Sequence, residues 1–424
     1  MKVLIQQASI IDPGSAHNGS RSDILIESGI IKDIQPSILV EADHVIKGND
    51  LAVSPGWMDV FANFADPGQE YKETLESGVE AAASGGFTDV LVIPNTHPVV
   101  DTKSQVQYIK HKSGSLLVTV HPIGALSKSA EGKELAEMYD MRNSGALAFS
   151  DGLHPVQSAG LLVKALQYVK AFDGVVIQIP DDKSLGAHGL MHEGVISTRL
   201  GLAGKPMMAE ELLVARDIKL ARYADSKLHF TGVTSPKSLE YIRRAKEAGL
   251  KVTCSVTPYH LFFTDEALTE YDTNLKVYPP LRTQTELSAI KQAVLDGTVD
   301  CIATHHLPHE TDSKIVEFEA AAFGMIGLET CYAALKTAMP EVKEEKWIEL
   351  LSINPRKIFG LPAMSIKKEA AAIVTIYQPS ELITVNEKFF KSRSRNSAFL
   401  GKQLKGKVVG VINGSKNYFV NSQN

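Results

Sequence analysis

Between residues 53 and 362 the sequence alternates repeatedly between short β-branched runs and longer amphipathic stretches. The amphipathic stretches include Leu161–Phe172, Ala209–Tyr223, Pro236–Gly249 and Gln284–Asp296. The predicted strands are Trp57–Ala62, Asp89–Ile93, Leu117–Val120, Ala146–Phe149, Val175–Ile179, Leu228–Thr231, Val252–Val256 and Val299–Thr304. Alternation of this kind implies parallel strands with right-handed crossovers. Eight strands, without a glycine-rich dinucleotide loop after any of them, predict an α/β fold of the (β/α)8 TIM-like type.

The two ends of the chain have a different pattern, in which apolar and polar residues alternate over short runs. At the carboxyl end these runs are Ala372–Tyr377, Glu381–Val385 and Lys407–Asn413. A period of two is typical of small antiparallel strands. We therefore expect residues 1–52 and 363–424 to form one small β-sandwich domain beside a barrel domain of residues 53–362.

The composition excludes several classes of protein. The formal net charge of −5 leaves no basic surplus, so nucleic acid and anionic membrane surfaces are not expected partners. No apolar run reaches the roughly 18 residues of a membrane helix, and the first residues do not resemble a signal peptide. Cys254, Cys301 and Cys331 are widely spaced in apolar surroundings, which indicates reduced core thiols and a cytoplasmic protein.

The segment from Pro55 to Thr74, PGWMDVFANFADPGQEYKET, resembles the first-strand signature of the dihydroorotases, which are metal-dependent cyclic amide hydrolases of the amidohydrolase superfamily. The frame of that signature, from the Pro-Gly pair to the final Lys-Glu, is present. However, Phe61 and Asn63 stand where the family has two metal-binding histidines, and Ala65 stands where it has a substrate-binding arginine.

A second long segment carries the same resemblance. Residues 189–217, GLMHEGVISTRLGLAGKPMMAEELLVARD, match the family almost without a gap, and we expect His192 within it to have a packing role. Further matches extend to the last strands, so the resemblance covers essentially the whole chain. It implies a metallo-hydrolase barrel with a β-sandwich.

Reactive side chains of such barrels project from the carboxyl ends of the strands. Pro94-Asn95-Thr96 resembles the family motif whose asparagine contacts substrate, although Asn95 also suits a turn. Asp151 lies in a motif whose aspartate can bind metal, but Gly152 replaces a neighbouring acidic residue. Ile179 occupies the position of a histidine ligand.

The later strands show the same substitutions. Gly232 replaces a metal-binding histidine, and Tyr278 replaces an asparagine that contacts substrate. Tyr259 replaces a histidine. In ATHHLPH, His305 replaces the aspartate that touches metal and moves the proton, whereas His306, Pro308 and His309 match the family.

These changes remove what a metal-activated hydrolase needs. The metal lowers the pKa of its bound water from about 15.7 to about 7. The four histidine positions are Phe61, Asn63, Ile179 and Gly232, so no cofactor is expected. The resemblance implies a pseudoenzyme of pyrimidine biosynthesis, because some inactive members of the family are structural partners of aspartate carbamoyltransferase. It also suggests a homodimer.

Two other hypotheses remain open. His305, His306 and His309, with Asp151, could form a relocated zinc site in an active dihydroorotase or a related hydantoinase-like or allantoinase-like enzyme, with Asp151 and His305 as the candidate catalytic residues. Alternatively, the barrel could bind a different small molecule without catalysis. Its pocket would be lined by Phe61, Asn95, Tyr259, Tyr278 and His309.

Overall fold

A barrel of eight parallel strands forms the larger part of the molecule. The structure is a computed structural model that describes residues 1–420. The strand order is β15-β14-β13-β10-β9-β8-β7-β6. Their bounds are β6 Trp57–Ala62, β7 Phe87–Val92, β8 Thr119–Gly124, β9 Ala148–Phe149, β10 Val175–Gln178, β13 Lys227–Thr231, β14 Val252–Val256 and β15 Cys301–Ile302. The predicted (β/α)8 fold is confirmed, and each predicted strand overlaps an observed one.

Contacts beyond the last strand bring the two edges of the barrel together. Ala62 of β6 forms a parallel bridge with His306, and the Asn63 amide donates to the His306 carbonyl at 2.8 Å. The buried Asp59 carboxylate accepts hydrogen bonds from the Thr304 amide at 2.7 Å and from the Thr304 hydroxyl at 3.0 Å. Asp59 therefore joins the first strand to the segment after the last.

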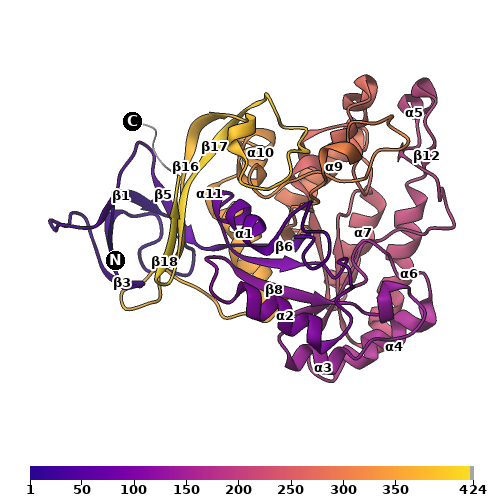
Figure 1. The fold of residues 1–424 in the computed structure, drawn as a ribbon, viewed down its shortest axis with the longest axis horizontal. Helices are drawn as coiled ribbons and strands as arrows, with labels where there is room; N and C mark the ends of the chain where they lie inside the picture. The colour runs from indigo at the N-terminus through magenta and orange to yellow at the C-terminus, as the bar shows by residue number, and fades with distance from the viewer. Residues whose placement is uncertain (421–424) are drawn as a thin grey trace.

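Helices cover the outside of the barrel (Figure 1). They are α1 Leu75–Ser84, α2 Lys103–Ser113, α3 Met138–Asn143, α4 Ala159–Lys170, α5 Val195–Leu200, α6 Met208–Ala224, α7 Pro236–Glu247, α8 Pro258–Phe262, α9 Gln284–Leu295, α10 Cys331–Ala338, α11 Glu344–Ile348 and α12 Asn354–Ile358. Between α5 and the barrel, β11 (Met191–His192) pairs with β12 (Gly204–Lys205). No helix within residues 1–420 is long and apolar enough to cross a membrane.

Both ends of the chain build one mixed sheet, where the indigo and yellow strands of Figure 1 lie together. Its strands are β1 Lys2–Ile10, β2 Arg21–Glu27, β3 Ile30–Gln35, β4 His44–Ile46, β5 Ala52–Pro55, β16 Ile373–Thr384, β17 Gln403–Asn413 and β18 Lys416–Phe419. The sheet branches at β1, which pairs with β4 through its first half and with β5 through its second. Two predicted strands are one, because β16 continues through a register shift between Gln378 and Leu382.

The mixed sheet passes directly into the barrel. Only Gly56 separates β5 from β6, and a Cβ atom at Gly56 would lie 2.2 Å from the Thr88 hydroxyl oxygen. Next to it, the buried Trp57 ring packs against Tyr332 and Tyr377, with ring centroids 5.0 and 5.3 Å away. Because Tyr377 belongs to the mixed sheet, the two parts share one core. The division at residues 52/53 and 362/363 stays a prediction.

Two kinds of side chain fill the barrel interior. Alternate residues of each strand face inward, and on several strands these are apolar, such as Val175 and Ile177 of β10, which Ile179 directly follows. On the neighbouring strands β13 and β14 the corresponding residues are polar. They are His229, Thr231, Thr253 and Ser255.

Candidate functional site

The carboxyl ends of the barrel strands, where sites of such barrels are built, carry most of the predicted site residues. The Phe61 ring at the end of β6 packs against the His305 ring at a centroid distance of 4.6 Å. The His305 Nε2 atom is hydrogen-bonded to the Thr231 hydroxyl at 2.8 Å. Both rings are about 99% buried, and they occupy the centre of the mouth.

Gly232 leaves the space that the His305 ring fills. A Cβ atom at Gly232 would lie 2.8 Å from His305 Cε1 and 3.0 Å from Pro279 Cδ. Gly232 also has a φ of +72°, a conformation that favours glycine. A side chain at residue 232 and an imidazole at residue 305 therefore compete for the same volume.

The other side chains at positions where the family has metal ligands are also hydrogen-bonded to the protein or packed in its interior. The Asn63 Oδ1 atom accepts a hydrogen bond from the Ala65 amide at 2.7 Å. Ile179 is fully buried among the apolar residues of the barrel interior. Asp151 uses both carboxylate oxygens to accept hydrogen bonds from the Ser127 amide at 2.8 Å and hydroxyl at 2.5 Å.

Asn95 holds the loop that follows β9. Its side-chain Nδ2 donates to the Asp151 carbonyl at 3.1 Å, and its Oδ1 accepts from the Leu153 amide at 2.9 Å. A Cβ atom at Gly152 would lie 1.8 Å from the Asn95 Oδ1. Because Gly152 has no side chain, the loop can approach Asn95 closely. Both the nitrogen and the oxygen of the Asn95 side-chain amide are hydrogen-bonded to this loop.

Tyr278 reaches a group that the sequence did not indicate. Its hydroxyl donates to the Asp181 Oδ2 atom at 2.6 Å, and Asp181 Oδ1 pairs with Lys205 at 2.9 Å. A cavity of about 10 Å³ lies beside these residues, next to the buried Arg282–Glu210 ion pair. That volume is roughly the space of one water molecule.

The histidines after β15 diverge from one another. His305 has a φ of +46°, and its ring points to Thr231, whereas the His306 Nε2 lies 3.4 Å from a Glu73 oxygen. His309 is hydrogen-bonded through Nε2 to the Phe323 carbonyl at 2.9 Å. The Nδ1 atoms of His305 and His309 have no partner within residues 1–420.

Glu73 connects this region to the carboxyl-terminal segment. Its carboxylate accepts hydrogen bonds from the Ser392 hydroxyl and from the Arg393 amide, the latter at 3.0 Å. His306 in turn accepts the Gly327 amide through Nδ1 at 3.2 Å. These two residues, which match the family, therefore hold loops together around the first strand.

Two of the residues considered from the sequence lie elsewhere. Tyr259 is buried in an apolar cluster with Met191 and Val277, apart from the cluster that contains Phe61. His192 is hydrogen-bonded through Nδ1 to Arg282 at 3.0 Å. Tyr259 thus packs outside the barrel interior, and His192 supports a buried arginine.

Burial keeps the mouth histidines uncharged near neutral pH. It lowers the pKa of His305 to about 4 and the pKa of His309 to about 4. Burial raises the pKa of Asp59 to about 6, against the opposing effect of its hydrogen bonds to Thr304. A neutral imidazole can bind metal, but here each ring has a fixed partner or an apolar neighbour.

The donor set does not fit a catalytic zinc ion, which needs several nitrogen or oxygen ligands and an open position for water. Phe61, Ile179 and Gly232 have no side-chain donor, and the Asn63 and Asp151 oxygens accept hydrogen bonds from the protein. Within residues 1–420, no three His, Cys, Asp or Glu side chains are grouped so that they could hold a metal ion.

The parallel barrel, with a branched sheet built from both ends of the chain, is also the fold of known hydantoinases. L-hydantoinase (dihydropyrimidinase) from Arthrobacter aurescens has the same fold, with a TM-score of 0.84 at 22% identity over 98% of this chain and 95% of that one. Dihydropyrimidinase from Brevibacillus agri NCHU1002 gives a TM-score of 0.83 at 19% identity, over 100% and 96% of the two chains.

Among the proteins with this fold, the sequence comparisons identify one family. A family model described as dihydro-orotase-like matches residues 51–238. A curated dihydroorotase from Thermoanaerobacter sp. strain X514 is 41% identical over 418 residues, which cover 97% of this chain and 96% of that protein. The dihydroorotase of Geobacter metallireducens is 40% identical, over 98% and 99% of the two chains. The chain belongs to the dihydroorotase family.

Sequence reasoning missed the partners of the site residues. Ser127, Thr231 and Asp181 are the hydrogen-bond partners of Asp151, His305 and Tyr278. Thr231 is the last residue of β13 and Asp181 follows β10, so both could have been noticed for their place at strand ends. Ser127 lies in a loop, and nothing in its local sequence indicates a role.

Proposed function

We propose that this chain is a dihydroorotase-family protein that does not hydrolyse cyclic amides and that serves as a structural partner of aspartate carbamoyltransferase. The family supplies the link to pyrimidine biosynthesis. The change of function is proposed from the mouth of the barrel. The proposed partner rests on the resemblance, since inactive members of this family assemble with that enzyme.

The observation that carries the proposal is the fit between His305 and Gly232. The His305 ring lies where it would contact a Cβ at residue 232 at 2.8 Å, and Phe61 packs on its face. Three positions that hold metal-binding or catalytic groups in the family thus form one packed unit. Independent losses of single ligands would be expected to leave gaps between these side chains instead of mutual contact.

The relocated zinc site is less well supported. His305, His306 and His309 point to Thr231, Glu73 and Phe323 respectively. A shared metal would require the three rings to turn toward one point and to give up these contacts. The predicted small-ligand pocket has little room beside Tyr278, where the cavity has a volume of about 10 Å³. A hollow of about 470 Å³ lies among the loops that follow β8, β9 and β10, but none of the predicted pocket residues lines it.

The test of hydrolysis uses protein that is purified without chelator. Elemental analysis is run with a dihydroorotate hydrolysis assay, with and without added zinc. We expect less than about a tenth of a zinc ion per chain and no turnover, since three of the family ligand positions lack a donor. A full equivalent of zinc with turnover would overturn the proposal and support the relocated site.

The test of partnership is separate. The full chain and the aspartate carbamoyltransferase of the same organism are mixed at micromolar concentration and moderate salt, and are then resolved on a sizing column. We expect both proteins in one peak of higher mass than either alone. Elution of the two proteins at their separate positions would overturn the proposed partnership. It would not affect the proposal that the chain does not hydrolyse cyclic amides.

Two further parts of the proposal concern state and location. We propose a homodimer, as the resemblance suggests, which light scattering of the purified chain would measure. We also propose a cytoplasmic location, because the three cysteines are free and buried, as expected where thiols stay reduced.

A further inference from the structure

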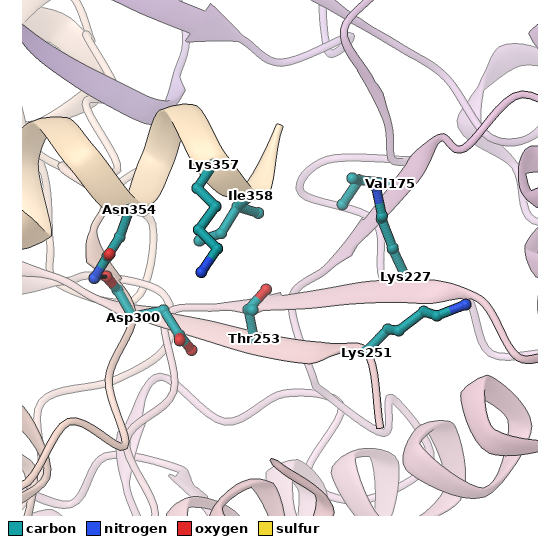
Figure 2. Close-up of a pocket in the computed structure, with 8 residues that line it drawn as sticks. All are labelled: Val175, Lys227, Lys251, Thr253, Asp300, Asn354, Lys357 and Ile358. Atoms are coloured by element: carbon teal, nitrogen blue, oxygen red, sulfur yellow. Dashed lines mark hydrogen bonds between the residues drawn. The ribbon is translucent and has the colours of Figure 1, made fainter. Parts of the chain in front are cut away.

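A cleft of about 270 Å³ lies at the amino-terminal end of the barrel, opposite the mouth. Its walls come from the starts of three barrel strands, from the residue before β15 and from α12 (Figure 2). The lining residues are Val175, Lys227, Lys251, Thr253, Asp300, Asn354, Lys357 and Ile358. Neither the family resemblance nor the proposed function assigns a role to this cleft.

Lysine side chains supply most of the charged groups that line the cleft. Three lysines and one aspartate line it. The aspartate, Asp300, is already neutralised, because its oxygens accept hydrogen bonds from Lys246 and from the Cys254 amide, both at 2.8 Å. The lysines are therefore opposed by no free carboxylate from the lining itself.

The three lysines differ in how they are held. Lys227 pairs with Asp173 at 2.6 Å and Lys251 with Asp225 at 3.0 Å, and neither aspartate lines the cleft. Lys357 is exposed and forms no ion pair within residues 1–420. Figure 2 shows its side chain reaching from α12 toward the strand that carries Thr253. Lys357 is the ammonium group with freedom to meet an anion.

The remaining surface of the cleft is largely apolar and suits a small ring. Val175 and Ile358 supply aliphatic groups. The volume is below the roughly 300–1,000 Å³ of sites for drug-sized ligands, so the occupant is a small molecule. An apolar wall combined with a free cation selects a compact organic anion over a bare inorganic one.

The cleft also faces a polar line through the barrel. Thr253 is hydrogen-bonded to His229 Nδ1 at 2.9 Å, and His229 Nε2 is bonded to Ser255 at 3.1 Å. The Ser255 hydroxyl donates to Thr231 at 2.9 Å, and Thr231 meets His305 at the mouth. A ligand at Thr253 would thus contact the first member of a hydrogen-bonded series that crosses the interior.

We propose that this cleft binds a small organic anion of the ring-carboxylate class. The carboxylate lies at the Lys357 ammonium, and the ring lies against Val175 and Ile358. The site is independent of the proposed partnership and of hydrolysis, because every lining residue lies away from the mouth.

Benzoate and benzamide serve as matched probes, since they have the same ring but only benzoate is charged. Saturation-transfer NMR with the full-length chain measures their binding up to about 20 mM. We expect benzoate to bind more tightly than benzamide by at least about fivefold, which is the effect of one partly exposed charge pair. Equal binding of the two probes, or no binding of benzoate, would overturn the proposal.

The variant Lys357→Met keeps the aliphatic stem and removes the charge. Its control is Lys367→Met, because Lys367 is exposed and does not line the cleft. We expect the benzoate dissociation constant to rise at least about fivefold in Lys357→Met and to stay unchanged in the control. If Lys357→Met keeps the thermal midpoint of the native chain, it is folded. Unchanged benzoate binding by this folded variant would show that the anion does not bind at Lys357 and would overturn the proposal.

Inorganic phosphate separates a general anion site from the proposed class. Phosphate is added to the chain with bound benzoate, and the loss of the benzoate signal gives the affinity of phosphate for the site. A phosphate affinity equal to that of benzoate would show that the apolar wall contributes nothing, and would overturn the assignment to ring carboxylates. Weak competition by phosphate supports it.

Discussion

The polar side chains at the two ends of the barrel differ in the partners that they have. At the mouth, His305, Asp151 and Tyr278 are bonded to Thr231, Ser127 and Asp181, and Phe61 covers the centre. At the amino-terminal end, the same strands begin at a cleft into which an unpaired lysine projects. In barrels of this type the mouth normally carries the chemistry. Here the mouth is packed like a core, and a charged group without an ion-pair partner among the described residues, Lys357, lies at the other end.

The difference separates the residues that fix the frame from those that fill the mouth. The groups that fix the frame, such as Asp59 and Glu73, still join distant loops. At the mouth, Phe61 packs on the His305 ring, which fills the space beside Gly232. Asp59 and Phe61 both belong to β6, yet one joins the strand to a distant segment by hydrogen bonds and the other fills the mouth.

The largest effect that would sharpen this comparison is expected from Phe61→Ala. Phe61 is about 99% buried, so its loss leaves a cavity, and we expect the free energy of unfolding to fall by about 3–5 kcal/mol. The matched change at the other end, Ile358→Ala, removes a half-buried side chain and should cost about 1 kcal/mol or less. Denaturant titration measures both. Similar costs at the two ends would mean that the mouth is not packed as a core.

A smaller effect is expected from Gly232→Ala. The added Cβ meets His305 and Pro279 and sits at a positive φ, so we expect the free energy of unfolding to fall by about 2–3 kcal/mol. In the double variant with His305→Ala, only the cost of the positive φ and of the contact with Pro279 should remain. A coupling energy of about 1 kcal/mol or more from the double-mutant cycle would confirm the contact. Strict additivity would contradict it.

The third effect concerns pH. His305 has a pKa of about 4 when folded, below its usual value of 6.5, because burial disfavours the charged ring. The unfolded chain therefore takes up more protons between pH 6.5 and 4, and the stabilising contribution of the neutral ring is lost as the pH falls through that range. At pH 5 the loss is about 2 kcal/mol for this residue.

The measurement is the free energy of unfolding at pH 7.5 and pH 5, for the native chain and for His305→Asn. The difference between the two pH values should be smaller in the variant by about 2 kcal/mol. Burial lowers the pKa of His229 to about 3, with a smaller contribution from His305, so burial keeps the His229 ring uncharged at pH 5 in both proteins. An identical pH dependence would show that His305 is accessible to protons in the folded state.

The smallest effect is expected from Lys357→Met. This lysine is exposed and unpaired, so the free energy of unfolding should change by no more than about 0.5 kcal/mol. The same denaturant titration measures it. A loss above about 1 kcal/mol would give Lys357 a structural role, and the contrast between the two ends of the barrel would then be weaker.

Much of the fold could be predicted because its signals are local. The period of the strands and helices placed β6 at Trp57–Ala62 and β14 at Val252–Val256 with the observed bounds. The pattern divided β16 in two at its irregular stretch, where the strand shifts register but continues. The last strand, β18, was missed, since its four residues are only half-buried and give no clear alternation.

The candidate site could be predicted only in part. The resemblance identified Phe61, Gly232 and His305 as changed positions, but it could not show that their side chains pack together. Contacts between residues far apart in sequence depend on the closed barrel. Tyr259 shows the limit most clearly, because its position in the motif suggested the mouth whereas its ring packs with Met191.

The direct passage from β5 through Gly56 into β6 has a consequence for the order of events during synthesis. β5 pairs antiparallel with β16. The strand that leads into the barrel therefore cannot form this pair until residues near the other end of the chain have been synthesised. Ribosomes add roughly 5–20 residues per second, which makes this delay on the order of tens of seconds. For that time the newly made amino-terminal strands carry an open edge, which is where strands of other chains can add. The cell must therefore shield an unfinished sheet until the final residues emerge, and a message truncated before β16 would yield a chain prone to aggregate.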